Sequence, residues 1–371
     1  MWYVVISFLV SATVTLFLVR YARLHARFTG DHDTDGVQKF HDGVVPRVGG
    51  VSLLAAAIAG CVVCAVREDG LFLAMLLLLL ASLPAFAGGL AEDLTKRVTP
   101  MVRLLLTMLS GLLAFYFLDA QVVRLNIWGV DWLLQYGVVS LIVTLVVIGG
   151  SANAINIIDG YNGLAAVVSG LIFAGFAYVS FYLGDRLLVA TSVTMIGALA
   201  GFFIWNYPKG LIFLGDGGAY FVGFMMGETA VLLLYRHPSV SAWFPLLLCI
   251  YPVFETLFSV YRKKVVKGRS PGMPDGVHLH MLVYKRVVRW CIGSVEPRHK
   301  IQRNALTSPY LWVLSSLGFV PAVLFWQYQY ALMFCVLVFS ATYIWLYRAL
   351  VNFGIPKWMV LRRVRRNGRR G

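Results

Sequence analysis

The stretch "VVSLIVTLVVIGGSANAINIIDGYNGLAA" (residues 138–166) joins two apolar runs through a short polar break. The first run, from Val138 to Ile148, is continuous rather than alternating. In lipid this predicts a helix, because a helix satisfies its own backbone hydrogen bonds. The break then places three Asn and one Asp, Asp159, where hydrocarbon would solvate them poorly. We therefore expect a membrane span to end there, at a place where the protein handles polar molecules.

Apolar stretches of this kind recur along the whole chain. Hydrophobic residues make up 59% of its 371 residues, and many runs reach the ~18 residues that span ~30 Å of hydrocarbon. The sequence therefore predicts an all-α, polytopic integral membrane protein with about 11 transmembrane helices, forming a single membrane-embedded domain over residues 1–371. The expected spans are 2–19, 48–66, 71–91, 101–118, 133–150, 163–183, 187–205, 217–235, 243–261, 310–326 and 331–347.

Basic residues predict the orientation of these spans. No Lys or Arg precedes the first span, and Arg20 and Arg23 follow it, which favours an N-terminus outside the cell. With that start, 28 of the 32 Lys and Arg fall on the cytoplasmic side, including loop 262–309 and the basic C-terminal tail 351–371. The net charge of +15 then reflects topology and attraction to anionic membrane lipid. We expect no nucleic-acid partner.

Polar motifs concentrate on the cytoplasmic side of this topology. The outward loops are short, whereas the inward segments are rich in Gly, Asn, Asp, His and Lys. Because the inward motifs sit at the ends of different helices, they can converge without placing an ionised group at the bilayer centre. They are "HDGVVPRVGG" (41–50), "AEDLTKR" (91–97), the polar break, "FLGDGG" (213–218) and "RKKVVKGRSPGMPDGVHLHMLVYKR" (262–286).

Carboxylates in these motifs come from three separate helix ends and would repel each other unless a cation lay among them. They are Glu92, Asp93, Asp159 and Asp216. Such oxygens, joined by the amide of Asn156, suit Mg²⁺ or Mn²⁺. Phosphate-directed side chains surround them, namely Lys96, Arg103, Lys267, Arg269, His278 and His280. Glycines 160, 163, 215, 217 and 218 would let an anion approach backbone N–H groups at helix starts. This combination is what phosphoryl transfer needs.

Each motif also has a purely structural interpretation. The acids at 92 and 93 could simply begin a loop, Asp216 could cap a helix, and Asn156 could join two helices. A proton-coupled transporter or lipid flippase is a rival of another class, supported only by Glu228 and Glu255 inside expected spans. The sequence shows no internal repeat, and the other acids lie at helix ends, so we favour the enzyme.

Four motifs, in order, resemble those of the polyprenyl-phosphate N-acetylhexosamine-1-phosphate transferase superfamily, of the glycosyltransferase 4 type. They are "GLAEDLTK" (89–96), "NAINIIDGYNG" (153–163), "FLGDGG" and "SP…DGVHLH" (270–280). The span count is most similar to the undecaprenyl-phosphate GlcNAc-1-phosphate transferase, or O-antigen, branch. The resemblance implies a Mg²⁺-dependent phosphotransferase of the bacterial inner membrane, with its active site facing the cytoplasm. It would pass a sugar 1-phosphate, GlcNAc as first choice, from a UDP-sugar to undecaprenyl phosphate and release UMP. The phospho-MurNAc-pentapeptide transferase reaction is the alternative, and a homodimer is one option for assembly.

The resemblance also implies roles for individual residues. Asp93, with Glu92 and Lys96 beside it, would activate or orient the lipid phosphate. Asp159 belongs to the central motif, Asp216 and Asn156 would hold the metal, Asn162 would contact uracil, and His278 and His280 would contact the diphosphate. Three residues depart from the family pattern. Glu92 stands where the family has Asp, Asn162 stands where bacterial members often have Asp, and Met281 stands where the family has a third His. We interpret the chain as a divergent branch that retains activity.

Overall fold

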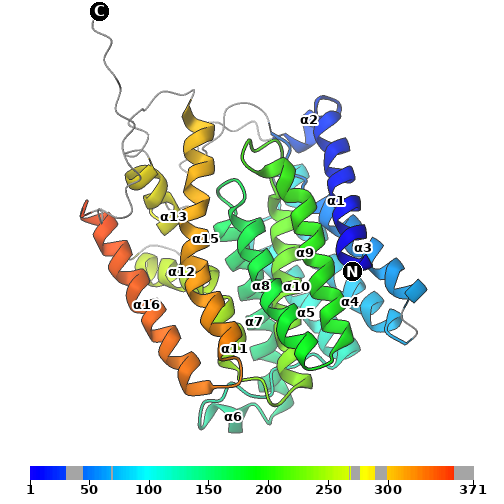
Figure 1. The fold of residues 1–371 in the computed structure, drawn as a ribbon, viewed down its shortest axis with the longest axis vertical. Helices are drawn as coiled ribbons and strands as arrows, with labels where there is room; N and C mark the ends of the chain where they lie inside the picture. The colour runs from blue at the N-terminus through cyan, green and yellow to red at the C-terminus, as the bar shows by residue number, and fades with distance from the viewer. Residues whose placement is uncertain (31–44, 68–69, 267, 269–275, 289–298, 355–371) are drawn as a thin grey trace, which may run out of the picture.

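The computed structural model describes residues 1–30, 45–67, 70–266, 268, 276–288 and 299–354. Within these ranges the protein is all-helical, and ten helices are long and apolar enough to cross a membrane. The prediction of an all-α polytopic membrane protein is confirmed (Figure 1). The ten are α1 (Trp2–Arg20), α3 (Gly50–Arg67), α4 (Phe72–Thr95), α5 (Pro100–Leu118), α7 (Gly137–Ile158), α8 (Leu164–Tyr182), α9 (Arg186–Asn206), α10 (Gly215–Arg236), α15 (Lys300–Leu324) and α16 (Gln329–Val351). The shorter elements are α2 (Ala22–Thr29), α6 (Val130–Leu133), α11 (Trp243–Leu248), α12 (Ile250–Tyr261), η1 (Arg262–Val266), α13 (Leu279–Leu282) and η2 (Val283–Val288).

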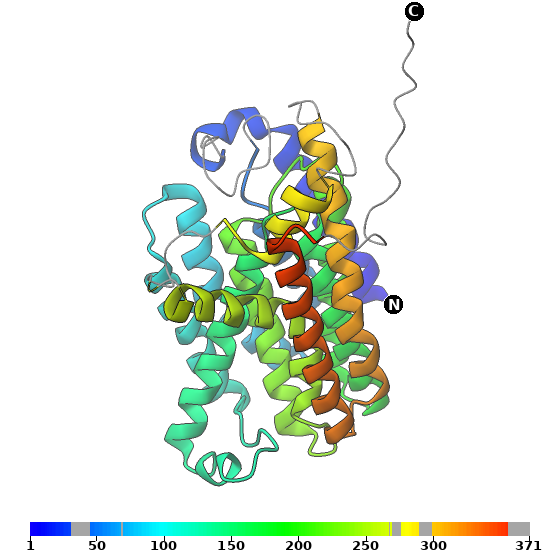
Figure 2. The same cartoon turned by 90° about the vertical axis from the view of Figure 1, so that its left-hand side faces the viewer.

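The ninth of the eleven expected spans, 243–261, is wrong as a continuous helix. The chain breaks at Cys249 into α11, of 6 residues, and α12, of 12 residues, and neither alone is long enough to cross a membrane. Pro252 lies in the first turn of α12, where its missing N–H is tolerated, and it cannot continue the hydrogen bonding of α11. Figure 2 shows α12 running crosswise to the long helices.

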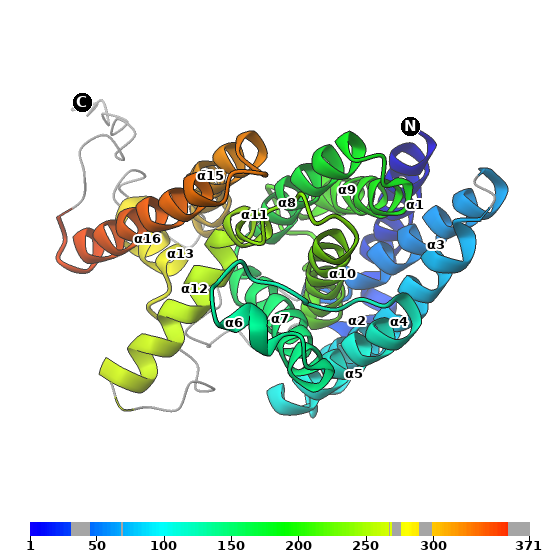
Figure 3. The same ribbon diagram turned by 90° about the horizontal axis from the view of Figure 1, so that it is seen from below.

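Helix α10 forms the centre of the bundle, with 20 of its 22 residues buried. Seen along the bundle, it lies among α4, α7, α8 and α9 (Figure 3). Two glycines allow other helices to touch its first turn. A Cβ on Gly89 of α4 would lie 2.6 Å from Gly217 N, and one on Gly50 of α3 would lie 2.8 Å from the carbonyl carbon of Gly217. The backbone at the start of α10 is thus held directly between the backbones of α3 and α4.

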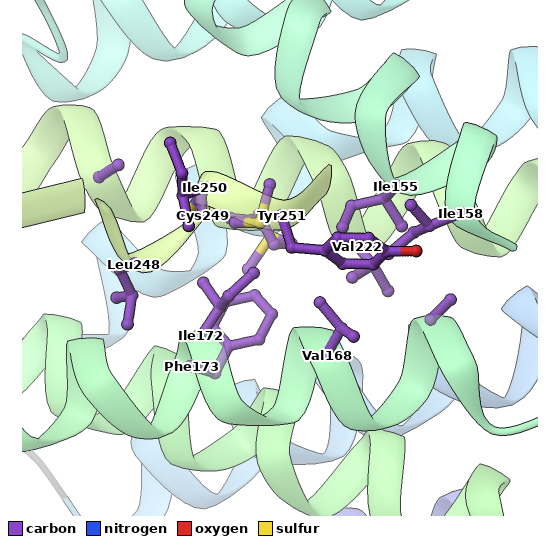
Figure 4. Packing of buried hydrophobic residues seen from close by; sticks show 14 of the residues in the cluster. Ile155, Ile158, Val168, Ile172, Phe173, Val222, Leu248, Cys249, Ile250 and Tyr251 are labelled. Carbon is purple, nitrogen blue, oxygen red and sulfur yellow. The ribbon is translucent and has the colours of Figure 1, made fainter. Parts of the chain in front are cut away.

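An apolar cluster lies directly behind the polar break. Ile155 and Ile158 of α7 pack there with Val168 of α8, Val222 of α10 and Tyr251 of α12 (Figure 4). The last turn of α7 is therefore fixed against three other helices. Helix α7 continues eight residues past the expected end at residue 150 and ends at Ile158, so Asn153 and Asn156 belong to its last turns and only the part of the polar break from Asp159 onward is non-helical.

Candidate active site

Asp93 holds the beginning of α10. It lies in the last turn of α4 and is only 1% exposed. Its Oδ1 accepts a hydrogen bond from Asp216 N at 2.9 Å, and its Oδ2 accepts one from Gly217 N at 2.8 Å. A carboxylate at the first amides of a helix is favoured both by charge-assisted hydrogen bonding and by the helix dipole. These two amides, which we expected to be open to a phosphate, are therefore already occupied by Asp93.

Asp216 is where three motifs meet. Its Oδ2 is paired with the guanidinium of Arg103 in the first turn of α5, and its Oδ1 accepts a hydrogen bond from Asn156 Nδ2 at 2.7 Å. The same guanidinium lies over the ring of Tyr220, 5.5 Å from its centroid. Asp216 is 8% exposed, so these charged groups are largely shielded from water and interact strongly. The structure thus joins the ends of α5, α7 and α10 through one carboxylate.

Asp159 completes the acidic cluster. It follows the last residue of α7 as the helix cap. Burial and the nearby negative charges of Asp216 and Asp93 raise the pKa of the Asp159 carboxyl to about 7, while the positive charge of Arg47 acts in the opposite direction. Carboxylates that influence one another in this way lie close together. The structure therefore gathers the acids from three helix ends.

Glu92 and Lys96 face a different part of the site. Glu92 Oε2 accepts a hydrogen bond from Val98 N at 2.7 Å, which stabilises the turn between α4 and α5. Lys96 ends α4 in the left-handed conformation, with φ of 57°, and its side chain is exposed. Asp93 alone of the neighbouring acids 92 and 93 reaches the start of α10. The catalytic roles of Glu92 and Lys96 stay predictions.

The two loop histidines lie against the polar break. Their rings stack with centroids 5.2 Å apart and planes inclined by 4°, because His278 is extended (ψ 154°) and His280 is already in α13. The buried His280 ring packs edge to face with Tyr161, and the two ring centroids are 5.6 Å apart. A Cβ on Gly160 would lie 3.7 Å from Nε2 of His280. Burial lowers the pKa of His280 to about 3 despite the opposing charge of Glu255, so this imidazole is neutral.

Asn162 is engaged within the protein. Its backbone N–H donates to Asn304 Oδ1 at 2.8 Å and its Nδ2 donates to Pro208 O at 2.9 Å. The next residue, Gly163, donates its N–H to Asn206 Oδ1 at 2.5 Å. The amides at the start of α8, which we also expected to be open to an anion, are therefore used to fix the loop. Contact between Asn162 and a uracil base stays a prediction.

Comparison with known proteins finds a family that matches the centre of the chain. The family model for "Glycosyl transferase family 4" matches residues 75–234, which include Asp93, Asp159 and Asp216. Over these residues the chain is similar to glycosyl transferase family 4.

Curated relatives of this protein have modest identity over most of their length. A probable undecaprenyl-phosphate N-acetylglucosaminyl 1-phosphate transferase of Bacillus subtilis is 25% identical over 75% of this chain and 76% of its own. An undecaprenyl-phosphate alpha-N-acetylglucosaminyl 1-phosphate transferase of Thermotoga maritima is 27% identical over 78% of this chain and 82% of its own. A phospho-N-acetylmuramoyl-pentapeptide-transferase of Streptococcus thermophilus is 27% identical over 61% of this chain and 65% of its own.

A magnesium ion fits the acidic cluster through two carboxylates and one amide oxygen. Among the described residues, no group of three or more His, Cys, Asp or Glu is placed to hold a metal. Mg²⁺, however, commonly binds through one or two carboxylates together with water and substrate phosphates. Asp216 and Asp159, with the amide oxygen of Asn156, supply such a set. Both oxygens of Asp93 accept from backbone amides that are fixed at the start of α10, so this residue would not be a ligand. The oxygens of Asp216 are also engaged, but by the side chains of Arg103 and Asn156, which would have to turn aside for Asp216 to hold a metal.

The remaining expected site residues are two cations of the loop 262–309 and Met281. Lys267 and Arg269 lie outside the described residues. Met281, where the family has a third histidine, is buried in the apolar core. Its side chain therefore packs inside the protein, which accounts for an apolar residue at this position.

Arg47 is a site residue that the sequence reasoning did not single out. Its segment is held against the start of α10, because Phe213 N donates to Pro46 O at 2.9 Å and Gly50 N donates to Leu214 O at 2.9 Å. This pairing brings the positive charge of Arg47 to Asp159. The available signal was an Arg inside the glycine-rich stretch 41–50.

Proposed function

We propose that this protein transfers an N-acetylhexosamine 1-phosphate from a UDP-sugar to undecaprenyl phosphate. The products would be UMP and a lipid diphosphate sugar for cell-envelope polysaccharide of the O-antigen type. UDP-GlcNAc is the first choice of donor, because two of the relatives are named for N-acetylglucosaminyl 1-phosphate transfer. The observation that carries the proposal is the meeting of the α4, α5 and α7 ends at Asp216.

The reaction is a direct displacement at phosphorus. An oxygen of the lipid phosphate attacks the β-phosphorus of the UDP-sugar, and the bond from that phosphorus to the oxygen bridging the α-phosphate breaks, which releases UMP. A phosphate monoester with a second pKa of ~6 is already mostly dianionic at neutral pH. The protein therefore needs chiefly to align two anions and to offset their charge.

The described residues divide this work among them. Arg103 and Arg47 bring positive charge to the acidic cluster. Asp93 positions Asp216 by holding the first amides of α10. Asp216, Asp159 and Asn156 would hold Mg²⁺, which when bound neutralises charge on the donor diphosphate. Without a bound metal, burial and the negative charges of Asp216 and Asp93 raise the pKa of Asp159 to about 7, so binding of Mg²⁺ would require Asp159 to release its proton.

A transfer assay tests the proposal. Purified protein is given undecaprenyl phosphate, Mg²⁺ and, separately, UDP-GlcNAc, UDP-GalNAc or UDP-MurNAc-pentapeptide, and released UMP and lipid product are measured. Asp216→Asn should reduce UMP release to background. Asp119→Asn is the matched control, because Asp119 is exposed at the far end of α5 and its φ of 52° suits Asn. Wild-type protein that releases no UMP from any donor would refute the proposal.

The donor panel also separates the alternative within the family. The relative from Streptococcus thermophilus is named a phospho-N-acetylmuramoyl-pentapeptide-transferase, so UDP-MurNAc-pentapeptide is the alternative donor. Preferential turnover of that donor would assign the protein to peptidoglycan synthesis. The transporter alternative draws no support from Glu255, which is hydrogen-bonded between helices. Glu228 is fully buried within α10, so water does not reach it.

We also propose a location and an orientation. The inner membrane of a bacterium follows from the named relatives, and the acidic cluster would face the cytoplasm because the basic loops share its end of the helices. Labelling of single cysteines introduced at residues 96 and 119 in intact cells would test the orientation. A homodimer is an assembly to be tested by mass measurement in detergent.

A further inference from the structure

Glu255 connects three helices through one buried carboxylate. It lies on α12, the second half of the broken span, and is 1% exposed. Its Oε1 accepts hydrogen bonds from Leu279 N and from His278 Nδ1, both at 3.0 Å. Its Oε2 accepts one from the Tyr343 hydroxyl of α16 at 2.8 Å. A carboxylate that is removed from water needs several such donors to offset its desolvation.

These bonds determine which ring nitrogen of His278 donates to Glu255. An ionised carboxylate can only accept hydrogen bonds, so His278 Nδ1 carries a proton. The remaining nitrogen, Nε2, is left to interact with another group, as in other carboxylate–histidine pairs. The bond to Leu279 N fixes the start of α13 at the same time, so both the backbone and the ring of His278 are anchored by Glu255.

The anchored ring in turn supports the part of the loop that touches the acidic cluster. His280 makes no hydrogen bond through either ring nitrogen within the described part of the chain. Its place therefore depends on packing, namely on the parallel ring of His278, on Tyr161 and on Gly160. Gly160 directly follows Asp159 in the chain. Contacts thus run without a gap from Glu255 through both histidines to the acidic cluster.

We propose that Glu255 is a positioning residue for substrate binding, which acts by accepting a hydrogen bond from His278 Nδ1 and so holding the ring in one orientation, with Nε2 toward the donor diphosphate. This inference rests on the proposed function. The sequence places Glu255 inside an apolar span, outside the motif 262–286 that follows it, and the break at Cys249 and the crosswise course of α12 bring it to the histidine loop.

Glu255→Gln tests the inference with little change in shape. The amide oxygen can still accept from Leu279 N and His278, and its NH₂ group can donate to the Tyr343 oxygen, so the helices stay joined. The bond to His278 becomes a neutral one. We expect KM for the UDP-sugar to rise about tenfold, with kcat and KM for undecaprenyl phosphate changing less than about threefold.

Two further variants control for folding and for charge. Glu255→Asp keeps the carboxylate and should recover part of the lost affinity. Glu228→Gln makes the same substitution at a fully buried glutamate of α10 whose carboxyl oxygens have no hydrogen-bond partner among the described residues. This control should keep wild-type KM values. Thermal unfolding of each purified variant, followed by intrinsic fluorescence, reports on folding.

A double-mutant cycle decides whether the effect passes through His278. In a His278→Gln background, Glu255→Gln should raise KM less than about twofold, since the group it acts on is gone. An undiminished effect in that background would mean that Glu255 is only structural, and it would overturn the inference. If Glu255→Gln fails to fold, Glu255→Asp is compared in the same two backgrounds with the same criterion. Wild-type protein without UMP release would instead refute the proposed function, and the inference with it.

Discussion

Replacing Asp93 by Asn separates a positioning role from a role as a base. The side chain keeps its size, but one of its two acceptor oxygens becomes an NH₂ group that faces either Asp216 N or Gly217 N. A buried N–H left without a partner costs about 1–3 kcal/mol, and the surviving bond weakens by ~1 kcal/mol on becoming neutral. Loss of the anion at the start of α10 adds about 0.3–1 kcal/mol. Relief of repulsion between Asp93 and Asp216 offsets part of this, so we expect a net loss of roughly 2–4 kcal/mol in stability.

The same change should displace Asp216, because its own backbone N–H is one of the two donors. A misplacement of ~1 Å in a reacting group costs about 100-fold in rate, which is the loss we expect in UMP release per folded protein. Thermal unfolding and the transfer assay measure the two effects, with Asp119→Asn as the control. Wild-type unfolding temperature and wild-type rate for Asp93→Asn would refute the reasoning. A normal unfolding temperature with no activity at any pH would instead favour Asp93 as the base.

Three other predictions follow from the site. Binding of Mg²⁺ needs the ionised Asp159 carboxylate, so the affinity of the protein for Mg²⁺ should rise as pH increases through about 7, and Asp159→Asn should remove that rise in a Mg²⁺ titration. Folding raises the pKa of Asp159, so protonation of this carboxyl stabilises the folded protein. This stabilisation is fully present below about pH 4 and is lost as pH rises through about 7. In metal-free buffer, the unfolding temperatures of the wild type and Asp159→Asn should therefore diverge as pH rises. Gly89→Ala would place a methyl group 2.6 Å from Gly217 N, and we expect it to force α4 away from α10 and reduce UMP release at least tenfold; wild-type activity would contradict this packing. Asn162→Asp would set a carboxylate against the Pro208 carbonyl oxygen and lower stability by about 1–3 kcal/mol in a thermal unfolding measurement, whereas unchanged stability would show that this hydrogen bond is unimportant.

The local pattern of the sequence was enough to find most of the fold. Apolar runs of sufficient length determine membrane spans residue by residue, since each helix satisfies its own backbone. The prediction of a continuous span over 243–261 is wrong because apolar composition does not specify whether a helix is unbroken or how it is oriented. Pro252 was the one local signal of a break. The gathering of Asp93, Asp159 and Asp216 could also be predicted, because alternating spans put their helix ends on one side.

The partners of each polar side chain were decided only by tertiary structure. Sequence alone could not distinguish Asp93, which reaches the α10 amides, from Glu92, which turns to Val98. It also left Glu255 as an isolated acid in an apolar run, whereas packing gives it three donors from two other helices. The physical reason is range. Hydrophobic length and charge bias act along neighbouring residues, but a hydrogen bond requires atoms within about 3 Å, and that proximity between distant segments exists only once the helices have packed.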